Sequence, residues 1–177
     1  MEPVTLTVDG LVLSTPVERD IDQLALLCDD TLLRDTTTLP WPYSRADAEF
    51  FVRELVTPGW ANDSEFTFAL RDAPDGPLMG VVGWRAENSE IGYWLGAPHR
   101  GRGHMSAALA AVCDWIFATH DVSVITWQAI IGNIASARTA RSAGFRFIDE
   151  RPIPLPERYG PNPIGWYAER DRNDPSA

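Results

Sequence analysis

The order of strand and helix patterns along this chain limits the folds open to it more than any other feature. After an opening strand at 11–16, apolar spacing predicts two helices, one near 19–30 and one that begins after Ser44. Three strands, a helix, a strand, a helix and two strands follow. Strands joined by tight turns pair antiparallel, whereas strands joined through a helix pair parallel. The sequence therefore predicts an α/β fold with a mixed sheet.

The later elements have clear boundaries in the sequence. Alternating apolar residues and turn signals predict the three central strands, and a continuous apolar face predicts the longest helix. The expected strands are 65–72, 78–87, 89–96, 122–130, 145–152 and 164–171, and the expected helices are 106–120 and 133–144. One domain is expected over 1–177, with a disordered tail at 172–177.

Composition narrows the class of protein. The chain has 45% hydrophobic and 23% charged residues, lacks an apolar run of about 18 residues, and does not begin like a signal peptide. Cys28 and Cys113 fall inside helical patterns, which favours reduced thiols in a cytoplasmic protein. The net charge of −10 disfavours nucleic acids and anionic membranes as partners and favours cationic ones.

The stretch Arg100–Met105, RGRGHM, concentrates glycine and positive charge between a predicted strand and the longest predicted helix. A strand that turns directly into a helix exposes the first helical N–H groups, where they bind anions. Glycine lets successive N–H groups converge on a phosphate, and arginine adds charge at the rim. The stretch predicts a phosphate or pyrophosphate site, with a solvated basic turn as the alternative.

The same stretch resembles the acyl-CoA-binding motif of the GNAT acyltransferase superfamily, Q/R-x-x-G-x-G/A. Arg100 and Gly103 match the first two anchors, and Met105 replaces the usual small residue. The segments EIGYWLGAPHRGRG and GNIASARTARSAGF are similar to the RimJ/RimL-like branch, which acetylates protein N-termini and related amines. The resemblance covers about 10–171, with Ser14 where that branch often has arginine. It implies a mixed, mostly antiparallel sheet of about seven strands with about four helices, splayed at the CoA site.

The resemblance also implies where acetyl-CoA binds. Backbone amides of Arg100–Met105 would hold the pyrophosphate, and the pantetheine arm would follow the strand Ile91–Leu95. Gly92 and Gly96 permit a bulge that would open the sheet, and a backbone N–H near the end of this strand would polarise the thioester. The expected CoA-binding residues are Trp94, Leu95, Arg100, Gly101, Arg102, Gly103, His104, Met105, Asn133 and Ser136.

Two further groups are needed for acyl transfer, an acid and a base. Many GNAT members use a tyrosine seven residues after the asparagine as the acid, but Ala140 stands there. Ser136 is the remaining candidate to protonate the CoA thiolate, and a first-turn helix residue is the alternative. Glu90 is the first candidate for the base. Its rivals, each with a solvated surface role as the alternative, are Asp149, Glu150 and Glu157.

Loop aromatics and histidines complete the candidates. Trp41, Tyr43 and Trp60 lie next to Pro or Gly, off the periodic faces, so they are expected either to wall the substrate site or to anchor loops. The three histidines have no metal-ligand spacing, and no metal is expected.

Three functions fit these features. The first is an acetyl-CoA-dependent N-acetyltransferase acting on a protein N-terminus. The second is an acyltransferase for a small-molecule amine or antibiotic, and the third is a non-catalytic acyl-CoA-binding sensor. Intact Asn133 and Ser136 beside an intact glycine stretch weigh against the sensor. The acceptor, the choice of acetyl or succinyl donor, and a monomeric or homodimeric state stay open.

Overall fold

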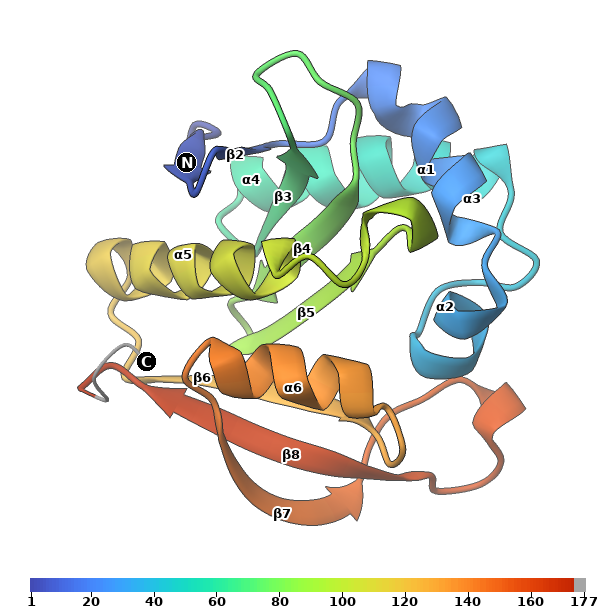
Figure 1. Ribbon diagram of the computed structural model, residues 1–177, viewed down its shortest axis with the longest axis vertical. Helices are drawn as coiled ribbons and strands as arrows, with labels where there is room; N and C mark the ends of the chain where they lie inside the picture. Colours follow the sequence, from blue (N-terminus) through green and yellow to red (C-terminus); the bar gives the residue numbers. More distant parts are fainter. Residues whose placement is uncertain (174–177) are drawn as a thin grey trace.

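Eight strands form one sheet in the computed structural model of the protein, which describes residues 1–173 (Figure 1). They are β1 (Leu6–Val8), β2 (Leu11–Ser14), β3 (Glu65–Arg71), β4 (Gly80–Arg85), β5 (Glu90–Leu95), β6 (Val124–Ile130), β7 (Arg146–Pro152) and β8 (Ile164–Asp171). Their order is β1-β2-β3-β4-β5-β6-β8-β7, and β5–β6 is the parallel pair among antiparallel ones. The predicted mixed, mostly antiparallel sheet is confirmed, with one strand more than expected.

The additional strand is β1, which forms a hairpin with β2. The turn residues Asp9 and Gly10 both have positive φ, 48° and 78°, as a two-residue type I′ turn requires. Asp-Gly is the sequence that favours this turn, but a three-residue strand is too short to show an alternation of its own.

Helices cover both faces of the sheet. The helical segments are η1 (Glu18–Asp20), α1 (Ile21–Cys28), α2 (Thr31–Thr36), α3 (Arg45–Phe50), the π-helical η2 (Phe51–Val56), α4 (Thr57–Ala61), η3 (Ala97–His99), α5 (His104–Thr119), α6 (Ile134–Ser142) and η4 (Glu157–Tyr159). α3, η2 and α4 run on without a break, and Ser44 is the N-cap as predicted, since its Oγ accepts from Asp47 N–H. α2 was not predicted, because six residues are too few for an apolar repeat.

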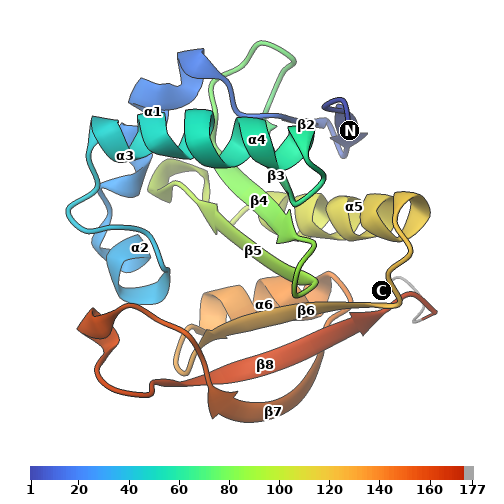
Figure 2. The ribbon, with the colours of Figure 1, turned by 180° about the vertical axis from the view of Figure 1, so that it is seen from behind.

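α5 and α6 lie against one face of the sheet, and the segment 45–61 lies against the other (Figures 1 and 2). The period-two alternation of β3 explains this arrangement. Phe66 and Phe68 contact Trp115 of α5, whereas Ala69 packs in a second core cluster with α1 and α3. Both faces of β3 are therefore covered.

The sheet opens between β5 and β6. One register pair, Glu90↔Thr126, joins these two strands, and Ser89 supports it with a 2.8 Å bond from Thr126 N–H to its carbonyl oxygen. β6 then pairs along its whole length with β8. The predicted splay of the sheet is confirmed at this position.

A buried ion pair fixes the start of α1 against β3. Arg71 and Asp20 are 1% and 3% exposed, and the guanidinium donates to both carboxylate oxygens at 2.8 and 2.6 Å. Arg71 Nε also donates to Ser14 Oγ at 2.9 Å. Ser14, the departure from the resembled branch, thus serves as an acceptor for an arginine from the neighbouring strand.

The chain end and the cysteines follow in part what the sequence predicts. Arg172, expected in the disordered tail, donates to the carbonyl oxygens of Val122 and His120 at 2.9 and 2.7 Å. Residues 174–177 of that tail lie outside the described residues. Cys28 and Cys113 are free and buried, and burial raises the pKa of each thiol to about 12. Among the described residues, no helix is long and apolar enough to cross a membrane.

The ring of His120 lies among aromatic side chains after the end of α5, with centroids 4.7 Å from Phe66 and 5.2 Å from Trp84. Burial lowers the pKa of His120 below its ordinary value of 6.5. The free energy of unfolding should therefore fall as the pH drops below about 6.5, because the unfolded chain then binds a proton that the folded ring resists. Urea unfolding across this range should show a smaller fall for His120→Gln. An identical pH dependence in both proteins would contradict this assignment.

Candidate active site

A cavity of about 1010 Å³ runs along β5. Its lining includes the residues Arg100–Met105, here called the glycine loop, apart from Arg102, and the start of α6 at Asn133 and Ser136. It also includes α2 with the segment after it, and Ile153–Leu155 of the loop between β7 and β8. Most of the predicted site residues are therefore brought together in one space.

The glycine loop has the backbone of an anion cradle. Gly101 and Gly103 have φ of +77° and +79°, where side chains are strained, and Gly103 is the N-cap of α5. In the described part of the chain, the N–H groups from Gly101 to Met105 donate no hydrogen bond to the backbone. A Cβ on either glycine would meet no atom within 4 Å, so the space beside these N–H groups is open to a ligand.

The two arginines of the loop differ. Arg100 points inward, where its Nε donates to the Leu95 carbonyl oxygen at 2.7 Å and its Nη2 lies 2.9 Å from Asp30 Oδ2 in an ion pair. Asp30 is also the N-cap of α2 and accepts from Leu32 N–H at 2.7 Å. Arg100 therefore positions the loop and lines the cavity, whereas Arg102 is exposed and lies outside the cavity lining.

The strand β5 runs beside the cavity without the predicted bulge. Its pairing with β4 is continuous from Gly80↔Leu95 to Arg85↔Glu90. The sheet opens instead because β6 turns away. Gly96 is small for packing, since a Cβ there would lie 2.7 Å from a Leu27 methyl carbon. Trp94 and Leu95, two of the residues predicted to bind CoA, line the cavity.

Ser136 lies in the first turn of α6, where its N–H donates to Asn133 Oδ1 at 3.3 Å. Its Oγ donates to the Tyr93 hydroxyl at 3.1 Å, and that hydroxyl donates to the Ser136 carbonyl oxygen at 2.7 Å. Burial raises the pKa of Tyr93, so its phenol stays protonated. Tyr93 thus spans the opening between β5 and α6 and holds the Ser136 hydroxyl at the cavity wall.

The candidate bases differ in how they are placed. Glu90 lines the cavity, but its two oxygens accept hydrogen bonds from Arg85 and Gln128. The late-strand rivals lie outside the cavity lining. Asp149 is held by Arg151 at 2.7 Å, which lowers the pKa of that carboxyl. Glu150 accepts from the Trp166 indole at 3.2 Å, and Glu157 is exposed in η4.

The three loop aromatics have three different environments. Tyr43 is 9% exposed and lines the cavity. Trp41 is 37% exposed and lies under the Arg34 guanidinium, 5.4 Å from the ring centroid. Trp60 is 1% exposed and its indole N–H donates to the Thr67 carbonyl oxygen at 3.1 Å. The expectation that Trp60 walls the substrate site is wrong, because Trp60 lies in α4 instead of a loop and its ring packs edge-on against Phe66 and Phe68 in the core.

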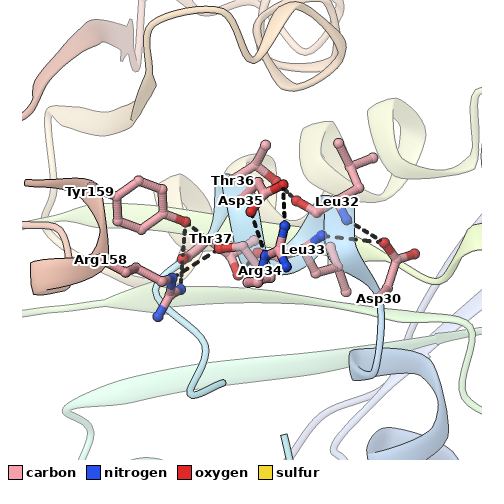
Figure 3. Close-up of polar contacts among 9 residues, drawn as sticks. All are labelled: Asp30, Leu32, Leu33, Arg34, Asp35, Thr36, Thr37, Arg158 and Tyr159. Atoms are coloured by element: carbon pink, nitrogen blue, oxygen red, sulfur yellow. Dashed lines mark hydrogen bonds and ion pairs between the residues drawn. The ribbon is translucent and has the colours of Figure 1, made fainter. Parts of the chain in front are cut away.

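The loop between β7 and β8 is fastened to α2 (Figure 3). Arg158 donates to the carbonyl oxygens of Arg34 at 3.0 Å and of Thr37 at 2.5 Å. The Tyr159 hydroxyl lies 2.6 and 2.8 Å from the same two oxygens. The end of a helix leaves such carbonyls unpaired and favours a cation. These contacts, here called the α2 bridge, join two segments that line the cavity.

Other lining residues were not singled out from the sequence. Glu65, Thr67 and Gly83 belong to β3 and β4, and Gln128 belongs to β6. The available signal was the alternation of Glu65 and Thr67 with phenylalanines in a strand covered by helices on both sides. Polar side chains on a covered face indicate a site, but their cross-strand neighbours are known only once the register is known.

Comparisons with known proteins agree with this geometry. A family model described as an acetyltransferase (GNAT) domain matches residues 10–146. The chain belongs to the GNAT acetyltransferase family. It is thus an acetyltransferase, as expected from the sequence. No curated protein sequence matches the chain.

Solved structures show the same GNAT fold. The ribosomal-protein-S5-alanine acetyltransferase from Vibrio fischeri is 18% identical with a TM-score of 0.80, over 97% of this chain and 98% of that one. RimL, a ribosomal L7/L12 α-N-protein acetyltransferase bound to coenzyme A, is 20% identical at 0.78, over 96% and 98%. Spermidine N-acetyltransferase from Vibrio cholerae, with CoA and spermine, is 16% identical at 0.75, over 93% and 97%. The predicted likeness to the RimJ/RimL-like branch is confirmed at the level of fold.

Gly103→Val is expected to abolish CoA binding in calorimetric titration, because the isopropyl group would fill the open space beside the loop amides. Gly10→Val is the matched control, since Gly10 also has φ of +78° and open space but lies outside the cavity lining. Both variants should lose a similar free energy of unfolding, on the order of 1–2 kcal/mol from left-handed strain. Equal CoA affinity in the two variants would contradict the cradle.

Proposed function

We propose that this protein transfers the acetyl group of acetyl-CoA to the α-amino group of a protein N-terminus. The observation that carries the proposal is the single cavity along β5, whose lining includes the glycine loop with its backbone anion cradle as well as α2 and the loop after β7. Two reactants can therefore meet along β5. The likeness in fold to two ribosomal-protein acetyltransferases supports a protein acceptor.

The residues of the cavity suit acetyl-CoA as donor. The unpaired N–H groups of the glycine loop would bind the pyrophosphate. The extended pantetheine arm would lie along the open edge of β5, where an additional strand would pair. Acetyl-CoA supplies the activated thioester. A backbone N–H at Trp94 or Leu95 is the proposed donor to the developing oxyanion, since a fixed amide needs no reorganisation during the reaction.

The CoA thiolate that leaves then has to be stabilised or protonated. Ser136 Oγ is held by Tyr93 at the start of α6, where the helix dipole also favours negative charge. We assign Ser136 to the thiolate, with Tyr93 as its positioning residue. The reaction needs a soluble donor and acceptor, and a cytoplasmic location remains the prediction made from the sequence.

Release of free thiol from acetyl-CoA tests the proposal directly. Peptides with a free amino terminus should give faster thiol release than the same peptides with a blocked terminus, and faster release than spermidine or an aminoglycoside. Succinyl-CoA serves as the donor control. Turnover confined to small amines would replace the protein acceptor with a small-molecule one, and no turnover with any amine would overturn the enzymatic proposal.

Ser136→Ala should lower kcat at least tenfold, equivalent to about 1.4 kcal/mol of transition-state stabilisation, with little change in CoA affinity. Tyr93→Phe should lower kcat less, because it leaves the serine but removes the hydroxyl that orients it. Ser142→Ala, at the exposed end of α6, is the control. A Ser136→Ala enzyme as fast as this control at every pH would show that water protonates the thiolate.

A further inference from the structure

The face of the sheet opposite α5 carries a row of charged side chains inside the cavity. Glu65 of β3 is in register with Arg85 of β4, and Arg85 is in register with Glu90 of β5. Gln128 of β6 extends the row by donating to Glu90. In this row two carboxylates therefore flank one guanidinium.

The Arg85 guanidinium is paired with one of these two carboxylates, that of Glu90. Arg85 donates to one Glu90 oxygen, and the other oxygen accepts from Gln128 and, at 3.5 Å, from Asn88. Within the described residues, the hydrogen bond found for the Glu65 carboxylate is a long one of 3.5 Å from Thr67 Oγ1. Glu65 is thus the carboxylate of the row with capacity for another cation.

The Glu65 side chain also lies next to a part of the sheet that carries no side chains. Gly83 and Gly92 lie opposite each other in β4 and β5 and are here called the glycine trough. A Cβ built on Gly83 would lie 3.4 Å from Thr67 Oγ1 and 3.6 Å from Glu65 Oε1. A Cβ built on Gly92 would meet no atom within 4 Å. The trough therefore provides room beside β5 for a small group in contact with Glu65.

We propose that Glu65 binds the ammonium group of the acceptor in the glycine trough and takes its proton before acyl transfer. This inference rests on the proposed function, because it assigns the donor and the acceptor to opposite sides of β5. It defines the acceptor as a primary amine whose reacting nitrogen arrives with its positive charge. A carboxylate in a partly buried site is stabilised by such a cation and costs free energy without one.

The protons balance in this scheme. The ammonium gives one proton to the Glu65 carboxylate, leaving a free amine and a neutral carboxylic acid. The nitrogen lone pair forms the bond to the thioester carbonyl carbon, and the carbon–sulfur bond breaks. The second proton lost by the nitrogen goes to the CoA thiolate, and Glu65 returns its own proton to water. The products are an amide, a free thiol and one released proton.

Burial supports the assignment. It raises the pKa of Glu65, while the charge of Arg85 and the hydrogen bond from Thr67 oppose the rise. A carboxylate with a raised pKa is a better proton acceptor than an ordinary one. The other charged or titratable side chains that line the cavity are Tyr43, Asp47, Arg85, Glu90, Tyr93, Arg100, His104 and Arg138.

The test compares Glu65→Gln with Glu87→Gln, a control in the exposed turn between β4 and β5. With the best acceptor from the thiol-release screen, Glu65→Gln should lower kcat/KM for the amine at least thirtyfold and leave the acetyl-CoA KM within twofold. The pH profile of kcat/KM for Glu65→Gln should also differ from the wild-type profile at high pH. Gly83→Ala, whose methyl would make ordinary contacts, should raise the amine KM by filling the trough.

A binding experiment separates this inference from the proposed function. CoA-saturated protein is titrated with a tripeptide that has a free amino terminus, and with its N-acetylated form. Wild type should bind the free peptide at least tenfold more tightly than Glu65→Gln does. The two proteins should bind the acetylated peptide with the same affinity. Such a result supports Glu65 even if turnover is absent. Equal affinities for the free peptide, or a Glu65→Gln rate equal to that of Glu87→Gln, would overturn the role of Glu65.

Discussion

The parting of β5 from β6 is the constraint on which the rest of the structure depends. An open sheet edge leaves peptide groups without partners, and such groups must find water, side chains or a ligand. Here β4 completes one side of β5, β8 completes β6, and the Tyr93–Ser136 contact bridges the gap toward α6. The remaining edge lies in the cavity, so the groups that destabilise an empty sheet are the ones that an extended ligand would satisfy.

The two sides of this opening use different chemistry. Toward α5 the protein offers backbone N–H groups, which recognise phosphate through geometry and tolerate wide changes in the surrounding side chains. Toward α3 and η2 it offers side chains, with Glu65, Arg85 and Glu90 in one row. A net charge of −10 over the whole chain suits the second side better than the first. Anion binding at the glycine loop would therefore depend on local backbone geometry, because the chain as a whole carries a negative charge.

Local sequence patterns predicted most of the fold, and short element length together with strand register explains what they missed. The longest helix was expected at 106–120 and begins two residues earlier, at His104, because Gly103 serves as its N-cap. β1 and α2 were missed because three and six residues are too few to show a repeated apolar pattern. The glycine loop was found because its chemistry is contiguous in the sequence. Glu65 was not, because its meaning depends on neighbours in β4 that only the pairing of strands reveals.

The six-residue helix α2 is too short to be stable alone, and its neighbours hold it at both ends. Asp30 ties its first turn to Arg100 of the glycine loop, and the α2 bridge ties its last carbonyls to Arg158 and Tyr159. The cavity wall formed by α2 is thus tied both to the glycine loop and to the loop after β7. The conformational entropy of ordering this wall is already lost on folding, so a ligand that enters the cavity does not have to organise it on arrival.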